Sequence, residues 1–359
     1  MQSCLGLYIE NNIIKYAKIT RNKEELKVDA FGIKIYTNLE QTINQIVSET
    51  FSFKVPISIN LSEEMYDYFY MSNLLNSKDL DKAIETEFES LCYEKQNNPN
   101  AIISRYALVN DEEEKERIKV INVSVDKAKI GKITQLLDEK RIGTITPISM
   151  SIPNIAPLEK NENTLIVNLE DVTTVTTLIG QKVYNVSTLQ VGAGQILEKI
   201  SSKVNSYAKA YEICKNTTIY TMDGQELQKN ESEYLEDIVP ILYTIASQIR
   251  DIIGASLFKV NKVFITGTGC VINNIDLYFE EYLEGVKCEI LKPKFIKVTP
   301  DINIKDYIEV NSAISLALSG LGVGINGMNF KKVSTADKLK EIFTIEVGSK
   351  KSQVGRKNP

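Results

Sequence analysis

Two short apolar runs meet at a polar turn in the stretch Gly6-Leu7-Tyr8-Ile9-Glu10-Asn11-Asn12-Ile13-Ile14-Lys15. The runs predict two strands, Leu5–Ile9 and Ile13–Ile19, joined as a β-hairpin through the three polar residues. A third strand is expected at Leu26–Tyr36. After it, apolar residues at helical spacing predict an amphipathic helix over residues 39–47, followed by a strand at Val55–Leu61.

The same order of elements returns in the second half of the chain. We expect a hairpin, a third strand, one long helix and a buried strand there, at Thr164–Leu169 with Thr173–Ile179, Lys182–Leu189, Gln195–Cys214 and Val263–Thr266. A β-meander followed by a helix and a parallel strand, present twice, is typical of two α/β units that face each other across a cleft.

A different unit is predicted between the two halves. Its helix Ser77–Tyr93 would begin at Ser77 as N-cap. Strands are expected at Ser104–Val109 and Arg117–Val125, and a last helix, Asp126–Arg141, would end near Gly143. This pattern indicates a small inserted α+β subdomain.

Composition excludes several function classes. The 359 residues are 43% hydrophobic and 25% charged, which is typical of a globular chain of two or more domains. A net charge of −5 argues against a nucleic-acid partner. The chain has no histidine and no CxxC pair among its five cysteines, so Cys/His zinc sites and Ser-His or Cys-His catalysis are not expected. No signal peptide or membrane span is predicted, and we expect the cysteines to be buried in a reducing compartment.

Six segments together resemble the PilM family of type IV pilus assembly proteins and, more distantly, FtsA. They are Gly6–Lys15, Ile166–Thr174, Val191–Ile196, Ser247–Asp251, Phe264–Ile272 and Asn311–Leu321. The resemblance implies an actin-like ATPase fold, a duplicated RNase H-like α/β architecture with an inserted subdomain. The implied division is 1–61 with 144–158 as the first half, 62–143 as the inserted subdomain, 159–323 as the second half and 324–359 as a C-terminal tail.

Both phosphate hairpins depart from the family pattern. Where the family has an Asp and, two residues on, a glycine, this chain has Tyr8 and Glu10 in the first hairpin, and Asn168 and Glu170 in the second. Glycine lets the backbone approach a phosphate, whereas glutamate adds bulk and a negative charge. Two like charges about 4 Å apart repel by roughly 1 kcal/mol in water and roughly 4 at an effective dielectric of 20. We therefore expect no cofactor; ATP held through Mg²⁺ bridged to a glutamate is the alternative.

The turn Gly267-Thr268-Gly269 resembles the family's adenosine motif. It is a candidate for weak nucleotide binding, and it is equally the pattern of a tight strand-to-helix turn. Nothing in the sequence places a residue to activate water, so we interpret the chain as a scaffold rather than a catalyst.

The tail contains a candidate partner motif, Ile325, Asn326, Met328, Asn329 and Phe330. It resembles the I-N-L-L-P motif by which the family binds PilN. The resemblance implies docking between the first half and the inserted subdomain, by strand addition, with Met328 and Phe330 as apolar anchors and an asparagine as the polar one. Basic residues near the end suggest the hypothesis of a fused PilM–PilN protein cut before its membrane helix; an ordinary tail is the alternative.

The resemblance implies a cytoplasmic scaffold at the inner face of the cell membrane. Its expected partners are PilN or a fused PilN-like segment, the pilus assembly ATPase and the inner-membrane pilus complex. Three alternatives remain open from the sequence. They are a nucleotide-switched actin-like ATPase, a polymer-forming relative of FtsA, and a type II secretion platform protein.

Overall fold

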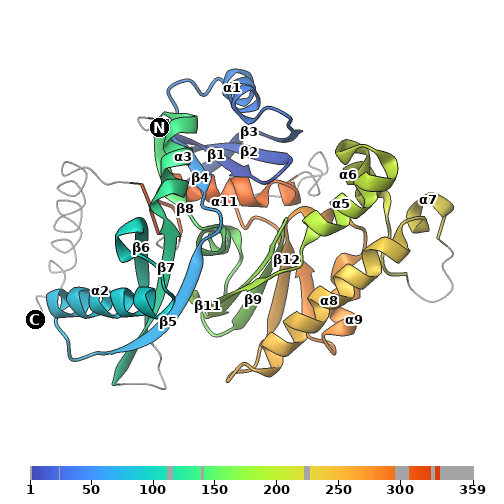
Figure 1. The fold of residues 1–359 in the computed structure, drawn as a ribbon. Coiled ribbons are helices and arrows are strands. Elements are labelled where there is room, and N and C mark those ends of the chain that lie inside the picture. Colours follow the sequence, from blue (N-terminus) through green and yellow to red (C-terminus); the bar gives the residue numbers. More distant parts are fainter. Residues whose placement is uncertain are drawn as a thin grey trace, which may run out of the picture.

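The computed structural model describes residues 2–23, 25–110, 116–138, 141–221, 227–295, 307–324 and 328–331. Two five-stranded sheets and one three-stranded sheet form its framework (Figure 1). The two larger sheets have the same topology, with orders β3-β2-β1-β4-β8 and β11-β10-β9-β12-β13. Each is a meander whose first strand then pairs with a parallel strand, so the predicted duplication is confirmed. None of the described helices is long and apolar enough to cross a membrane.

The first half is a three-layer unit. Its sheet consists of β1 (Gln2–Ile9), β2 (Ile13–Asn22), β3 (Glu25–Ile35), β4 (Ile57–Asn60) and β8 (Ile142–Thr146). The helix α1 (Leu39–Glu49) covers one face of this sheet, and its side chains Ile43, Ile46 and Val47 are buried there. On the other face lies α11 (Asn311–Gly320), which contacts β1, β2 and β4 together with α4 (Ile148–Ser151) and the 3₁₀ turn η3 (Ile152–Ile155) (Figure 1).

The second half is built around a sheet that is buried on both faces. Its strands are β9 (Asn163–Leu169), β10 (Thr173–Ile179), β11 (Lys182–Leu189), β12 (Lys262–Thr266) and β13 (Lys287–Ile290). Its helices are α5 (Ala193–Val204), α6 (Tyr207–Asn216), α7 (Lys229–Ser232), α8 (Leu235–Gly254) and α9 (Ile275–Tyr282), with the 3₁₀ turn η4 (Thr268–Val271). Leu165 and Val167 of β9 pack with α5, α8 and α9, whereas Ile166 belongs to the core of the first half. Alternate residues of one strand therefore join two cores.

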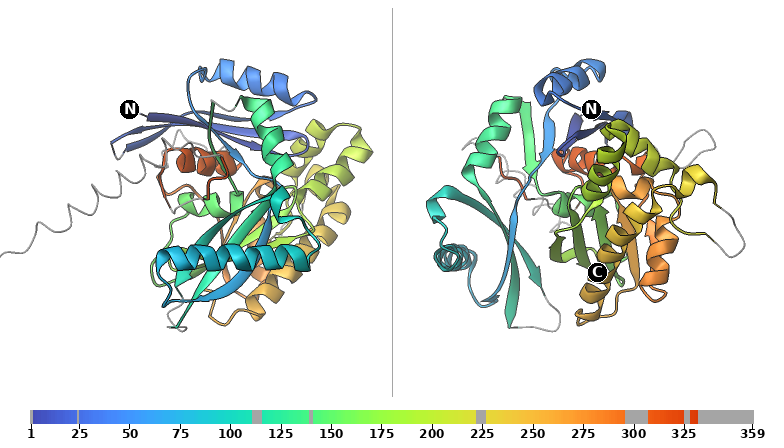
Figure 2. Two further views of the ribbon diagram at one scale, coloured as in Figure 1. Left: turned by 60° about the vertical axis from the view of Figure 1, so that its left-hand side comes forward. Right: turned by 45° about the vertical axis from the view of Figure 1, so that its right-hand side comes forward.

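The inserted subdomain has a sheet of order β5-β7-β6. Its elements are β5 (Met65–Ser72), α2 (Ser77–Glu94), η1 (Pro99–Ala101), β6 (Ile102–Asn110), β7 (Arg117–Asp126) and α3 (Lys127–Leu137). Seen from the side, α2 runs along the outer face of this sheet (Figure 2). Leu80 and Ile84 of α2 bury Val120 at the centre of β7, which gives the subdomain a small core of its own.

The subdomain also reaches the second half. The hydroxyl of Tyr68 on β5 donates to the carbonyl of Val186 at 2.7 Å and accepts from its N–H at 2.8 Å. Val186 lies on β11, an edge strand of the second sheet. The ammonium of Lys119 lies 3.7 Å from the ring centroid of Tyr184 on the same strand. The subdomain thus connects two units that are far apart in the sequence.

Four local predictions were wrong. The helix expected over Gln195–Cys214 is two helices, because Asn205 adopts a left-handed conformation (φ 54°) and Ser206 caps a new helix. The N-cap of α2 is Asn76, not Ser77: the Asn76 side chain accepts from the N–H groups of the helix's second and third residues. The helix α3 ends at Asp138 (φ 59°), so Gly143 is not its terminus.

The fourth error concerns β5 and β8, neither of which was predicted. Gly143 lies inside β8, which pairs with β4 and so belongs to the first sheet. The first half therefore resumes at Ile142 rather than at residue 144. Four of the eight residues of β5 are aromatic, a composition that favours a strand and that the sequence does contain.

A partly buried carboxylate lies at the junction between the first half and β5. Glu64 accepts from the Tyr66 hydroxyl at 3.0 Å, and that hydroxyl also contacts Ser149 of α4. Burial raises the pKa of Glu64 to about 7. The folded state therefore binds this proton more tightly than the unfolded state, and its stability falls as the pH rises from about 4.5 to 7.

Replacement of this carboxylate is expected to remove that pH dependence. Between pH 5.5 and 8, the free energy of unfolding of Glu64→Gln should rise by about 2 kcal/mol relative to the wild type. Urea unfolding of both proteins at the two pH values measures the difference. An equal response of the two proteins to pH would contradict a neutral, partly buried Glu64.

Candidate functional site

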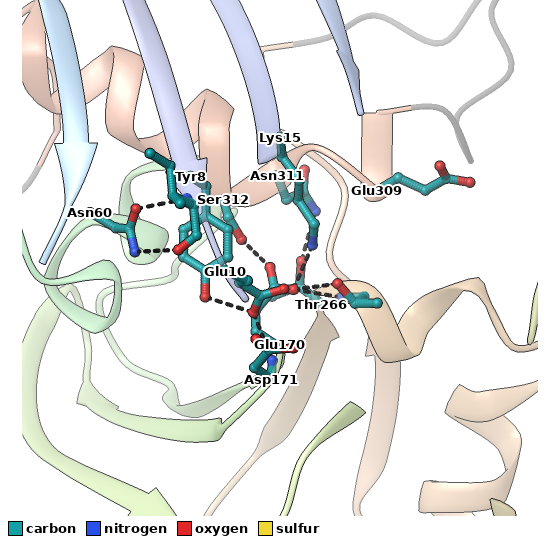
Figure 3. A network of polar contacts seen from close by, with 12 residues as sticks. Tyr8, Glu10, Lys15, Asn60, Glu170, Asp171, Thr266, Glu309, Asn311 and Ser312 are labelled. Carbon is teal, nitrogen blue, oxygen red and sulfur yellow. Dashed lines mark hydrogen bonds and ion pairs between the residues drawn. The ribbon is translucent and has the colours of Figure 1, made fainter. Parts of the chain in front are cut away.

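The two hairpin turns predicted to flank a phosphate site face each other in the structure (Figure 3). The backbone N–H of Asp171 donates to a carboxylate oxygen of Glu10 at 2.7 Å. In return, the N–H of Asn11 donates to the carboxylate of Asp171 at 3.0 Å. Each turn thus supplies an acceptor to the backbone of the other, which holds the two halves together at this point.

Glu170 lies at the centre of the site and is 1% exposed. Its carboxylate accepts from four donors. These are the Lys15 ammonium at 2.5 Å, the Thr268 N–H at 2.9 Å, the Thr268 hydroxyl at 2.7 Å, and the Ser312 hydroxyl (Figure 3). A cation, a backbone N–H at a turn and two hydroxyls form the kind of donor set that binds a phosphate. Here a carboxylate of the chain itself takes these hydrogen bonds.

Lys15 is placed by the alternation of β2. It shares a face of the strand with Ile13, whose side chain belongs to the core of the second half, and it is fully buried. A buried ammonium is costly unless it is paired, and the pairing partner comes from a residue 155 positions away. The sequence analysis did not select Lys15. An inward-facing lysine in a predicted strand is the signal that identifies it.

The first hairpin adds further acidic and phenolic groups. The Tyr8 hydroxyl donates to Glu10 at 3.1 Å. Burial, together with the neighbouring charge of Glu170, raises the pKa of Glu10 well above its usual value. Burial and the charge of Glu10 likewise raise the pKa of Tyr8. Burial also raises the pKa of Asp171, although the N–H of Asn11 opposes that shift. The site is thus crowded with groups whose negative forms are disfavoured.

The four substituted phosphate positions have different surroundings. Tyr8, Glu10 and Glu170 are in hydrogen-bonding contact with the network described above. Asn168 is 1% exposed, and neither atom of its amide has a partner among the described residues. In the same described ranges, no cluster of three or more Asp, Glu, Cys or His side chains is arranged to hold a metal ion.

The turn Gly267-Thr268-Gly269 packs tightly against β9. A Cβ at Gly267 (φ 96°) would lie 2.7 Å from the backbone of Leu169, and one at Gly269 would lie 2.9 Å from the Leu169 side chain. Both glycines are therefore required by packing, and Gly267 also by its conformation. The donors of Thr268 are engaged by Glu170. The cavity beside Gly269 measures about 10 Å³, which is too small for a nucleoside.

A larger pocket lies next to this turn. It has a volume of about 270 Å³ and is lined from Cys270 to Asp276 and by Lys215, Ile290, Ile308 and Glu309. Lys215 pairs with Glu309 at 2.8 Å, and the Tyr211 hydroxyl donates to the same carboxylate at 3.1 Å. The pocket has room for a small organic group. Two of its charged side chains, Lys215 and Glu309, already pair with each other.

Part of the predicted partner motif is bound to the body of the protein. The Phe330 N–H donates to the carbonyl of Ile145 on β8 at 2.8 Å, and the Asn329 side-chain oxygen accepts from the Ile145 N–H at 3.2 Å. Arg105 of β6 donates to the Asn329 carbonyl at 3.1 Å. We call the outer edge of β8 together with Arg105 the β8 docking site. Met328 is 6% exposed and Phe330 is fully buried in the core of the first half, whereas Ile325 and Asn326 lie outside the described residues.

No protein-family model matches the sequence, and no curated protein matches it. Among solved structures, a chain titled as the PilM-PilN type IV pilus biogenesis complex is 16% identical, with a TM-score of 0.70, covering 89% of this chain and 98% of that one. The ethanolamine utilization protein EutJ from Carboxydothermus hydrogenoformans is 9% identical (TM-score 0.49; 89% and 88% covered). MreB5 of Spiroplasma citri, bound to ADP, is 10% identical (TM-score 0.45; 88% and 95% covered). This chain therefore has the actin-like ATPase fold, in a form similar to that of the PilM–PilN complex.

Proposed function

We propose that the protein is a nucleotide-independent scaffold of the type IV pilus assembly machinery. The proposal rests on one observation. The Glu170 carboxylate already accepts hydrogen bonds from Lys15, Thr268 and Ser312, the donors that could otherwise bind a phosphate. An incoming nucleotide would have to displace this buried carboxylate and place its own charges beside Glu10 and Asp171. The similarity to a chain of the PilM–PilN complex supports the assembly role.

The proposed partner is a PilN-like segment that binds at the β8 docking site. It is either a separate protein or the protein's own tail. Binding of an extended segment to a sheet edge uses main-chain hydrogen bonds for affinity and alternate side chains for specificity. By analogy with the pilus system, the scaffold would link an inner-membrane complex to the assembly ATPase at the cytoplasmic face of the membrane. A type II secretion platform would use the same fold, and the identity of the captured partner distinguishes the two.

A second candidate function is a nucleotide-controlled switch. The 270 Å³ pocket beside the Gly267 turn favours it, because a base could enter there without crossing the Glu170 network. The switch function requires the Glu170 side chain to move when the phosphates of a nucleotide bind. Hydrolysis is not part of either proposal, because every acid of the two turns is held in contacts between the halves.

Thermal unfolding with and without millimolar ATP and Mg²⁺ tests the first proposal against the second. We expect no shift in the melting temperature of the wild type. The double variant Glu10→Gly/Glu170→Gly should be less stable than the wild type but gain several degrees with ATP, because Lys15, Thr268 and Ser312 are then free to bind phosphate. A clear shift in the wild type would instead support the nucleotide switch. The wild-type measurement decides this point even if the double variant does not fold.

A further inference from the structure

We propose that Met328–Lys331 is a built-in ligand of the β8 docking site and that it closes this site to separate peptides. The inference rests on the proposed function, since it concerns the surface assigned there to a PilN-like segment. It adds that the surface is regulated by the chain itself.

The first observation concerns the edge of the sheet. Among the described strands, β8 is the last in its sheet and has only β4 as a neighbour. The outward N–H and carbonyl of Ile145 would otherwise be unpaired. Phe330 supplies a donor to the carbonyl, and Asn329 supplies an acceptor to the N–H through its side chain. A third contact, from the Lys331 ammonium to the carbonyl of Ile142 at 2.5 Å, reaches the beginning of the same strand.

The second observation is the depth at which the segment is held. Phe330 is completely buried, and both it and Met328 are part of the core cluster that contains Ile142 and Ile145. The guanidinium of Arg105 lies 5.9 Å from the Phe330 ring centroid while it binds the Asn329 carbonyl. Burial of a phenylalanine and a methionine removes two large apolar side chains from water, which favours the bound segment. The segment is thus integrated in the core rather than laid on the surface.

These contacts define the chemistry of the ligand. The site takes an extended segment with apolar, asparagine and aromatic residues in succession. Asparagine suits the middle position because its side-chain oxygen also accepts from the N–H of Lys331 at 2.9 Å, which fixes the oxygen where Ile145 can reach it. A leucine there would leave the Ile145 N–H without an acceptor. A competing ligand must be a peptide of this same pattern.

The third observation concerns the covalent attachment of the segment Met328–Lys331 to the rest of the chain. Only three residues separate the described Gly324 from Met328, so the segment is tethered next to its site. A short tether gives an effective concentration on the order of 1 mM or higher. If the free peptide and the tethered segment have a similar intrinsic dissociation constant of about 10 μM, the tethered segment weakens binding of the free peptide about 100-fold. The wild type should therefore appear unable to bind a peptide that it is built to recognise.

Peptide binding to an emptied site tests this inference. The probe is a fluorescein-labelled peptide with the sequence of residues 324–332, measured by anisotropy against the full chain. We expect up to about 100-fold tighter binding to Phe330→Ala than to the wild type, because the alanine segment no longer holds the site. Adding Arg105→Met to Phe330→Ala should reverse most of that gain, since the guanidinium would no longer bind the Asn329 carbonyl of the probe.

The outcomes separate this inference from the proposed function. Equal binding of the peptide to the wild type and to Phe330→Ala would overturn the built-in ligand but leave the docking site in place. Absence of binding to both would overturn the docking site as well, while the nucleotide measurement would still stand. A second readout needs no variant: in the wild type, the Phe330 N–H should exchange with deuterium at least 100-fold more slowly than in an unfolded chain. Exchange at the unfolded rate would overturn the inference directly.

Discussion

Replacement of Lys15 by methionine is expected to lower the free energy of unfolding by about 3–5 kcal/mol, because it leaves the Glu170 carboxylate buried without its cation. The two side chains are 0% and 1% exposed, so water cannot take the place of the missing partner. The midpoint of urea unfolding measures the loss. The same change should weaken the contact between the halves, because the pair joins β2 of the first half to the turn after β9.

A double variant separates the effect of the unpaired charge on stability from the effect of the lost lysine packing. In Lys15→Met/Glu170→Gln the glutamine keeps an oxygen that accepts from Thr268, but the uncompensated charge is gone. We expect this double variant to recover more than half of the lost stability. The control is Lys129→Met, which removes the partly exposed pair with Glu63 and should cost less than about 1 kcal/mol. If Lys15→Met were no more destabilising than this control, the buried pair would not be what holds the two halves together.

A single methyl group at Gly6 is expected to disrupt the first half. A Cβ at this position of β1 would lie 2.0 Å from the carbonyl oxygen of Ala313 and 2.7 Å from the N of Ala317. Both are backbone atoms of α11, so no side-chain rotation relieves the clash. Gly6→Ala should therefore cost about 3 kcal/mol or more and reduce the soluble yield. Because α11 carries Ser312, its displacement would also remove a donor from Glu170.

The matched control is the same substitution at Gly131. This glycine lies within α3, and a Cβ there meets no atom within 4 Å. Gly131→Ala should raise the stability by about 0.5–1 kcal/mol, because alanine loses less backbone entropy in a helix. Thermal unfolding of both variants gives opposite shifts. Unchanged stability in Gly6→Ala would mean that α11 does not lie against β1 as described.

In the proposed function, a cleft occupied by the chain's own Glu170 carboxylate would change how this fold is used. In a nucleotide-binding form, the ligand itself would bridge the two halves, and their separation could follow its binding. Here the bridging group is part of the chain. It is supplemented by the reciprocal contacts of Glu10 and Asp171 and by the contact of Tyr68 on β5 with Val186 on β11. We infer that the relative position of the halves is set during folding. A fixed shape suits a scaffold whose partners bind to its outer surfaces.

The sequence by itself determined the repeated architecture. Alternating apolar residues around polar turns predicted the two hairpins, and the structure places them at β1–β2 and β9–β10. The substitutions Glu10 and Glu170 were also visible, and they led to the prediction that the hairpins bind no phosphate. Periodicity and turn chemistry act over a few residues, so a single sequence reveals them. The apolar pattern was misleading at Asn205, whose left-handed conformation ends a helix that the pattern would continue.

Only the tertiary structure decided what those residues do. The sequence analysis treated Glu170 as a charge that repels a ligand, whereas in the folded chain it is the acceptor that Lys15, Thr268 and Ser312 share. These donors come from three separate parts of the chain, and Phe330 likewise pairs with Ile145, a residue of a strand far earlier in the sequence. The physical reason is that a buried charge or a strand edge forms hydrogen bonds with the groups that the packing of distant elements brings close to it. A local sequence pattern does not contain information on which groups these are.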